Sequence, residues 1–264
     1  MKKLLLLNAL FFTAFVNAQM KEGRIVYERN FQLPTRIFNV DPAVASQIPK
    51  SRTDQFELLF GNNQSLWQYL PSINLEEQNT FSGNGVVLRF AGPSNEISYF
   101  NFDKAIRIDQ REIADKNYVV TDSVHKLDWK LSEETKIVLG HMVHKATAQR
   151  ISSRTRVTME NGEMKRQEFP DTAQVVAWYT TEIPVPTGPE FQGQLPGMIL
   201  ELDIDNGQTA YKALEISPKV NTSKIKEPKD GKKMTAAEFT KERQRVMEEM
   251  RKNMPDGNVI RIQN

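Results

Sequence analysis

The chain has 264 residues and nearly balanced charge, with 35 Lys or Arg against 33 Asp or Glu. This balance excludes the basic surface that nucleic-acid-binding proteins present to phosphate groups. The chain contains no cysteine, which excludes disulfide bonds, a catalytic cysteine and a lipid anchor on an N-terminal cysteine. Its stability therefore has to come from a hydrophobic core.

The first residues have the pattern of a secretory signal peptide. Two lysines precede the apolar run 4–16, and residues 16–18 (Val-Asn-Ala) place small residues where a signal peptidase reads the chain. The alternative is a membrane anchor, but the run is shorter than a bilayer-spanning helix and no stop-transfer pattern follows. We therefore expect residues 1–18 to be removed and the mature protein to be secreted to the periplasm. Association with the outer membrane stays open, and an integral membrane protein is not expected.

Short apolar, β-branched or aromatic runs alternate with Gly, Pro and Asn over most of the chain. This pattern is typical of an antiparallel sheet. Strands are predicted at residues 24–29, 55–60, 65–69, 86–90, 97–102, 105–108, 118–122, 136–139, 155–159, 175–179, 198–204 and 209–216. Two predicted hairpin turns, Gly61-Asn62-Asn63 and Asp205-Asn206-Gly207, consist of residues that tolerate a positive φ angle.

The best-specified backbone lies at Pro196-Gly197, where the dipeptide predicts a type II turn with a positive φ angle at Gly197. This turn ends a Pro- and Gly-rich segment, residues 184–197. It leads into residues 198–204, where apolar and acidic residues alternate as in a strand with one buried face. We expect the segment either to form the rim of a cavity or to serve only the fold.

The composition changes at residue 217 to a segment rich in Lys and Pro. We therefore divide the mature chain into a β domain at 19–216 and a C-terminal part at 217–264. Thr235 and Glu238 have the spacing of a capping box, which predicts a helix from there to about residue 253. Its apolar residues share one face: Phe239, Val246, Met247 and Met250. This face packs either on the chain's own sheet or on a partner protein.

Together these patterns predict a mainly β protein, with a bent antiparallel sheet or half-barrel and a C-terminal α-helix. By analogy, the architecture is similar to that of periplasmic lipoprotein carriers, which hold acyl chains in a curved sheet. Such an analogy of fold does not establish a function.

Several motifs resemble those of the GLPGLI family, secreted proteins of Bacteroidetes without an established activity. The motif that names the family corresponds to residues 194–199, and the chain departs from it at Gln194 and Met198. Further matches follow in the same order and spacing: Trp129-Lys130-Leu131, Thr135-Lys136-Ile137, residues 140–146, Ala177-Trp178-Tyr179, Ile183-Pro184 and Gly188-Pro189. The resemblance spans residues 23–216 and implies an exported protein.

Common catalytic motifs are absent from the sequence. It has no Gly-x-Ser-x-Gly elbow, no His-Glu-x-x-His pattern, no phosphate loop and no dinucleotide fingerprint. We therefore expect a non-enzymatic protein. A hydrolase with two carboxylates from distant strands is an alternative that the motifs do not support.

Aromatic residues and the motif segment provide candidate binding residues. Trp67, Trp129 and Trp178 either line an apolar cavity in the curved sheet or fill it as core. The full predicted ligand-binding set is Trp67, Trp129, Trp178, Tyr179, Leu195, Pro196 and Gly197. The expected partner is an apolar small molecule such as a lipid, or an envelope protein that docks on the concave face of the sheet.

A metal site is the second functional hypothesis. On a strand, Met142 and His144 would share one face while His141 would point to the other. Thioether sulfur and imidazole are ligands that copper(I) prefers. The sequence therefore suggests a copper site at His141, Met142 and His144, although an ordinary exposed strand explains the same residues.

Overall fold

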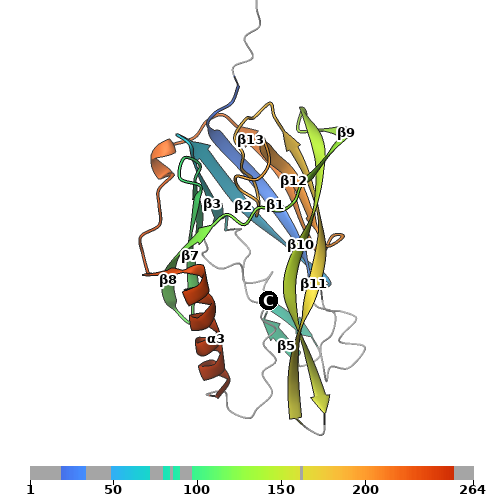
Figure 1. Ribbon diagram of the computed structural model, residues 1–264, viewed down its shortest axis with the longest axis vertical. Helices are drawn as coiled ribbons and strands as arrows, with labels where there is room; N and C mark the ends of the chain where they lie inside the picture. The colour runs from blue at the N-terminus through green and yellow to red at the C-terminus, as the bar shows by residue number, and fades with distance from the viewer. Residues whose placement is uncertain are drawn as a thin grey trace, which may run out of the picture.

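The computed structural model describes residues 19–33, 49–71, 80–83, 86–89, 97–160 and 163–252. The predicted signal peptide lies outside these residues. Within them, twelve strands form one large sheet and two more form a separate hairpin. A single α-helix follows the last strand (Figure 1). The predicted fold class, a mainly β protein with a bent sheet and a C-terminal helix, is confirmed.

The order of the strands in the large sheet differs from their order in the chain. The sheet order is β14 (Lys232–Thr235), β8 (Lys116–Ser123), β7 (Ile106–Ile113), β6 (Ile97–Asn101), β3 (Gln64–Tyr69), β2 (Ser51–Gly61), β1 (Gly23–Gln32), β13 (Thr209–Ser217), β12 (Met198–Ile204), β11 (Glu163–Thr180), β10 (His141–Glu160) and β9 (Lys130–Val138). The remaining elements are β4 (Thr80–Gly83), β5 (Val86–Arg89), the 3₁₀ turn η1 (Thr222–Lys224) and α3 (Ala236–Lys252). Neighbouring strands of the large sheet pair antiparallel, except β14 and β8, which pair parallel. β1 and β13, which lie far apart in the chain, thus pair near the centre of the sheet.

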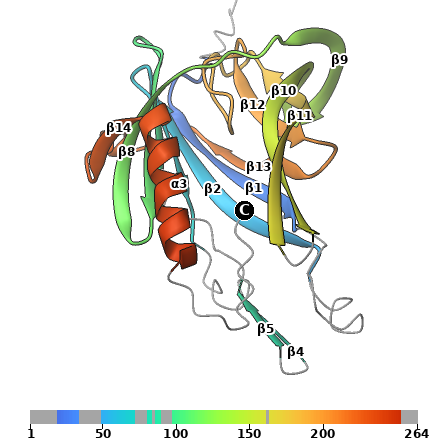
Figure 2. The ribbon, with the colours of Figure 1, turned by 60° about the horizontal axis from the view of Figure 1, so that its bottom comes forward.

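The sheet is strongly bent. Bulges interrupt the pairing of β1, β10 and β11 with their neighbours. A bulge adds local twist and bends the strand that carries it. The two ends of the sheet stand on either side of the central strands β1, β2 and β13 (Figure 2). We call β6, β7 and β8 the first arm and β9, β10 and β11 the second arm.

The second arm contains the longest strands. β10 and β11 have 20 and 18 residues, and their pairing continues from His144 and Tyr179 to Glu160 and Glu163. The strands predicted at 155–159 and 175–179 are therefore too short. Where their burial is described, residues 167–172 are exposed or half-buried. Because neither side of this stretch is buried, the sequence shows no alternation there.

Both predicted hairpin turns are confirmed. Asn62 and Asn63 have φ angles of 52° and 56° between β2 and β3. Asp205, Asn206 and Gly207 have φ angles of 59°, 53° and 87° between β12 and β13. Asn, Asp and Gly adopt such angles at low cost, so local sequence alone determines these two turns.

Helix α3 packs on the outer edge of the first arm. The capping box is confirmed, since the Thr235 amide donates to Glu238 Oε2 at 2.8 Å and the Glu238 amide donates to Thr235 Oγ1 at 3.3 Å. Phe239 and Val246 are buried in one cluster with Tyr118 of β8. The helix thus packs on the chain's own sheet. The predicted apolar face is wrong at one position, because 37% of Met247 is exposed.

The predicted type II turn at Pro196-Gly197 is wrong. Gly197 does not have a positive φ angle. A Cβ atom at this position would lie 2.0 Å from the backbone oxygen of Thr180, at the end of β11. Glycine is therefore required because two backbones approach each other closely, and not because of the local turn geometry.

We predict that Gly197→Ala lowers the free energy of unfolding by about 3 kcal/mol or more, because the new methyl group overlaps a backbone oxygen that cannot move away alone. The matched control is Gly207→Ala, where φ is positive but no atom lies within 4 Å of the new Cβ. That change should cost only about 1 kcal/mol. Urea denaturation of both variants measures the difference. Equal losses for the two variants would show that the contact with Thr180 is not the constraint.

Candidate functional site

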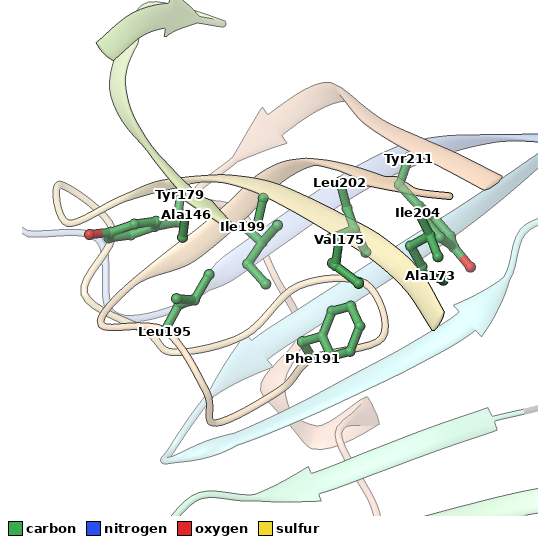
Figure 3. Close-up of a cluster of buried hydrophobic side chains, with 11 residues drawn as sticks. Ala146, Ala173, Val175, Tyr179, Phe191, Leu195, Ile199, Leu202, Ile204 and Tyr211 are labelled. Atoms are coloured by element: carbon green, nitrogen blue, oxygen red, sulfur yellow. The ribbon is translucent and has the colours of Figure 1, made fainter. Parts of the chain in front are cut away.

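Residues 184–197, which we call the roof loop, cover one face of the bent sheet. Phe191 and Leu195 of this loop are only 6% and 3% exposed. They pack against Val175 of β11 and Ile199 of β12 (Figure 3). The complete cluster is Ala146, Ala173, Val175, Ala177, Tyr179, Phe191, Leu195, Ile199, Leu202, Ile204 and Tyr211. The loop thus supplies the second layer of the core over the second arm.

Hydrogen bonds fix the roof loop to β12 and β3, near the centre of the sheet. The Ile199 amide donates to the Thr187 carbonyl at 2.9 Å, and the buried hydroxyls of Thr187 and Ser65 of β3 lie 3.1 Å apart. Gly193 packs closely on the ring of Phe100 in the first arm, where an added Cβ would lie 2.9 Å from the ring. The loop therefore contacts the centre of the sheet and both arms.

Gln194 joins the roof loop to the segment 124–129, which connects β8 to β9. Its Oε1 accepts hydrogen bonds from the Leu127 amide at 2.9 Å and from Trp129 Nε1 at 3.1 Å. Its Nε2 donates to the His125 carbonyl at 3.2 Å. Gln194 is not among the binding residues predicted from the sequence, although it stands out there as a departure from the family motif. That departure was the sign in the sequence that Gln194 has a role of its own, because the glycine that the motif has at this position cannot form these side-chain hydrogen bonds.

A cavity of about 360 Å³ lies between the arms and beside the roof loop. The first arm contributes Phe100, Arg107 and Asp122, the second arm Arg150 and Ile151, and the roof loop Glu190, Phe191 and Gln192. These arms lie near opposite ends of the strand order. They line one cavity because the sheet bends, so this inter-arm cavity lies on the concave face.

Ion pairs connect the charges of the first arm. Arg107 Nη2 lies 3.1 Å from Asp122 Oδ2, and Arg107 Nε lies 3.4 Å from Asp109 Oδ2. Asp109 also pairs with Arg111 at 2.8 Å, and His125 Nε2 lies 3.7 Å from Asp122 Oδ1. Two arginines thus face two aspartates, and this group of charges is compensated internally.

Glu190 of the roof loop forms a hydrogen bond with a tyrosine of β13. Tyr211 Oη donates to Glu190 Oε1 at 2.7 Å. Burial, together with the nearby Glu190 charge, raises the pKa of Tyr211 well above its ordinary value. Tyr211 therefore stays protonated at physiological pH and remains a hydrogen-bond donor to Glu190.

A second, more open groove of about 460 Å³ lies on the other side of Gln194. It is lined by residues 127–131 and by Gln194, Leu195 and Pro196. Trp129 is half-buried there, and its ring meets that of Phe191 edge-on at 5.4 Å. Three predicted binding residues, Trp129, Leu195 and Pro196, therefore line one groove.

The structure does not bring the other predicted binding residues into this groove. Trp67 packs among aromatic rings of the core, 5.2 Å from Tyr27 and 5.9 Å from Tyr211. Tyr179 is buried in the cluster beneath the roof loop. Trp178 lies under Lys136, whose Nζ is 4.3 Å from the centre of a Trp178 ring. Gly197 supports the groove indirectly, through its contact with Thr180.

The three residues of the metal hypothesis do not converge. His141 Nδ1 lies 2.7 Å from Glu182 Oε2, and this hydrogen bond lowers the pKa of Glu182. The ring of His144 lies against Tyr179 at 5.9 Å, and 48% of Met142 is exposed. Over the residues that the structure describes, no three His, Cys, Asp or Glu side chains are grouped to hold a metal ion.

No helix in the described part of the chain is long and apolar enough to cross a membrane. This result concerns helices alone.

Comparison with protein families confirms the resemblance found in the sequence. Residues 129–201 match the family described as "Protein of unknown function (Porph_ging)", which corresponds to the GLPGLI family. The matching segment runs from Trp129 through the second arm and the roof loop to Glu201 in β12. No curated protein matches the chain.

Solved structures of PNGF-II share the fold at low identity. Two crystal forms of PNGF-II match with 15% and 16% identity and TM-scores of 0.51 and 0.50. They align with 86% and 85% of this chain but with only 34% and 33% of the PNGF-II chain. LprF from Mycobacterium bovis matches with 6% identity over 81% of this chain and 92% of its own, with a TM-score of 0.29. The chain thus spans about a third of the length of the PNGF-II chains, and at these identities only the fold is shared.

We predict that Gln194→Ala lowers the free energy of unfolding by about 2 kcal/mol, because three hydrogen bonds of about 0.5–1.5 kcal/mol each are lost. The matched control is Gln149→Ala, an exposed position on β10. That change should alter stability by less than about 0.5 kcal/mol. Denaturation curves measure stability, and hydrogen exchange at the Leu127 amide reports the local bond. If Gln194→Ala lost no more stability than the control, Gln194 would not hold the loop.

Proposed function

We propose that this GLPGLI-type protein is an exported, non-enzymatic binding protein of the cell envelope that holds a ligand or a partner segment on the concave face of its sheet. The observation that carries this proposal is the inter-arm cavity. It is lined by two distant parts of the sheet and by the roof loop, and that loop lies within the segment that matches the family.

The geometry favours a binding site that exists before the ligand arrives. The roof loop is fixed by backbone bonds, by the Thr187 hydroxyl and by the amide of Gln194. Binding sites for small ligands are usually concave and largely pre-formed, and their apolar walls carry a few placed polar groups. The aromatic rings and charged side chains of the inter-arm cavity form such a mixture.

The ligand is not expected to be a long apolar chain alone. Phe191 and Leu195 already cover the apolar surface of the second arm, so little of it remains to hold an acyl chain. The walls that remain accessible carry Arg107, Asp122 and Glu190 beside the aromatic rings. Of the two expected partners, an apolar molecule and an envelope protein, this surface favours a ligand or segment of mixed polarity.

The pairing of the carboxylates supports a binding role over hydrolysis. A carboxylate dyad needs two acids that face one reacting atom. In the described part of this cavity, Asp122 is paired with Arg107, and Glu190 accepts a hydrogen bond from Tyr211. Both carboxylates thus interact with other residues of the chain and do not face one reacting atom together.

The cellular location belongs to the same proposal and rests on the sequence. The apolar run after two lysines and the small residues at 16–18 support export. A site open to the periplasm would meet peptides, sugars and envelope proteins. The natural ligand has to be sought in material from that compartment.

The test places a photo-crosslinking amino acid at Val124, a half-buried residue that lines the cavity. The protein is expressed and irradiated in the cells that make it. We predict a covalent adduct at Val124, identified by mass spectrometry. The matched control is Leu214 on β13, which is 40% exposed and does not line the cavity.

Adducts at both positions would indicate non-specific contact. A folded protein without an adduct at Val124, and with the bare mass of the mature chain in native mass spectrometry, would contradict the proposed function. An adduct at Val124 alone would give the mass of the ligand directly.

A further inference from the structure

Arg150 of β10 is a cation without a counter-charge in the described part of the chain. It lines the inter-arm cavity, and its Nε atom is buried and has no hydrogen-bond partner among the described residues. A buried charged group is unfavourable unless it is paired or hydrogen-bonded. Arg107 and Arg111 of the first arm also have a buried Nε without a hydrogen-bond partner in the described part of the chain, but their terminal nitrogens pair with aspartates. Arg150 differs from them because it forms no ion pair among the described residues.

The neighbouring carboxylates do not neutralise Arg150. Asp122 is shared between Arg107 and His125, and Glu190 is held by Tyr211. The strands of the second arm place Arg150 opposite Ala173 on β11, so the facing residue is apolar. Arg150 thus lines the cavity without an ion pair to a described residue.

A second polar group of the same cavity is also unused. Gln192 of the roof loop is only 6% exposed, and its side chain lines the cavity. Within the described residues, no other side chain or backbone group bonds to its amide. An amide both donates and accepts hydrogen bonds. Arg150 and Gln192 therefore offer donors to one ligand from two separate elements.

The charged side chains of the cavity determine which ligand charge binds best. A guanidinium group binds carboxylate and phosphate oxygens in pairs. Glu190 lines the same cavity, and its hydrogen bond from Tyr211 leaves its negative charge in place. This charge repels anions, and the repulsion grows with the charge of the ligand. A singly charged carboxylate is therefore favoured over a doubly charged phosphate.

Two aromatic rings complete the binding surface. Phe100 of the first arm and Phe191 of the roof loop both line the cavity. They are only 2% and 6% exposed, so each ring presents an edge to the cavity, and such edges contact the apolar part of a ligand. A carboxylate attached to a sugar ring or to an apolar side chain satisfies both parts of the cavity.

We propose that the inter-arm cavity binds a small organic monocarboxylate, with its carboxylate group on Arg150 and Gln192 and its ring or apolar face against Phe100 and Phe191. This inference rests on the proposed function and names its ligand class. Two kinds of natural ligand carry such a carboxylate group: an acidic sugar and the C-terminal residue of a peptide.

Calorimetric titration of the full mature chain distinguishes these sources with two matched pairs of probes. Methyl glucuronide is compared with methyl glucoside, and N-acetylphenylalanine with its amide. We predict that at least one acid binds and that its neutral counterpart binds at least about tenfold more weakly. The acid that binds identifies the source.

Variants then locate the site. Arg150→Gln should weaken binding of that acid at least about tenfold, and Arg150→Lys should restore part of it, because lysine keeps the charge but loses the planar pair of donors. The matched control is Arg245→Gln on α3, whose side chain pairs with Glu242 and Glu249 outside the cavity; its affinity should be unchanged. Gln192→Leu provides an independent variant and should also weaken binding.

The inference is overturned if neutral and acidic probes bind equally, if neither acid binds at millimolar concentration, or if the folded Arg150→Gln protein keeps full affinity. A crosslinked natural ligand without a carboxylate would overturn it as well, while leaving the proposed function intact. Conversely, absence of any adduct at Val124 removes the function but not the measured affinity for a probe.

Discussion

The packing of the roof loop onto the concave face is the interaction on which the rest of the structure depends. A bent sheet of twelve strands would otherwise expose the apolar side of its second arm and of β12, including Val175 and Leu202. Phe191 and Leu195 cover this surface, and burial of such side chains contributes about 1.5–3 kcal/mol each. The loop can lie close to the sheet because Gly197 has no side chain to meet the Thr180 carbonyl. The absence of disulfide bonds in a chain without cysteine makes this packing more important.

The same loop determines what space is left for a ligand. It divides the concave side into an open groove near Trp129 and a more enclosed cavity between the arms, with Gln194 lining both. The family match covers the second arm and the roof loop, and therefore includes Arg150 and Gln192. Phe100, Arg107 and Asp122 lie outside that match. The second arm and the roof loop thus lie in the matching segment, whereas the first-arm side of the cavity comes from another part of the chain.

The sequence predicted the features that depend on neighbouring residues. Asn62-Asn63 and Thr235 with Glu238 determine a turn and a helix start through their own dihedral angles and bonds. The role of Gly197 could not be predicted, because its constraint comes from the backbone of Thr180. Likewise, Arg150 is one of 35 basic residues in the sequence. Only the fold shows that its neighbours in the cavity are already paired while it is not.

The central claim is that the roof loop holds the two arms at a fixed separation, so that the cavity exists without a ligand. Because the chain has no cysteine, spin labels can be attached at Thr121→Cys on β8 and Gln149→Cys on β10, both exposed positions on opposite arms. Pulsed electron paramagnetic resonance then measures the distance between the labels in the ligand-free protein. The account predicts a single narrow distance distribution. A broad or two-state distribution would contradict it, because the arms would then move independently and the cavity would not be pre-formed.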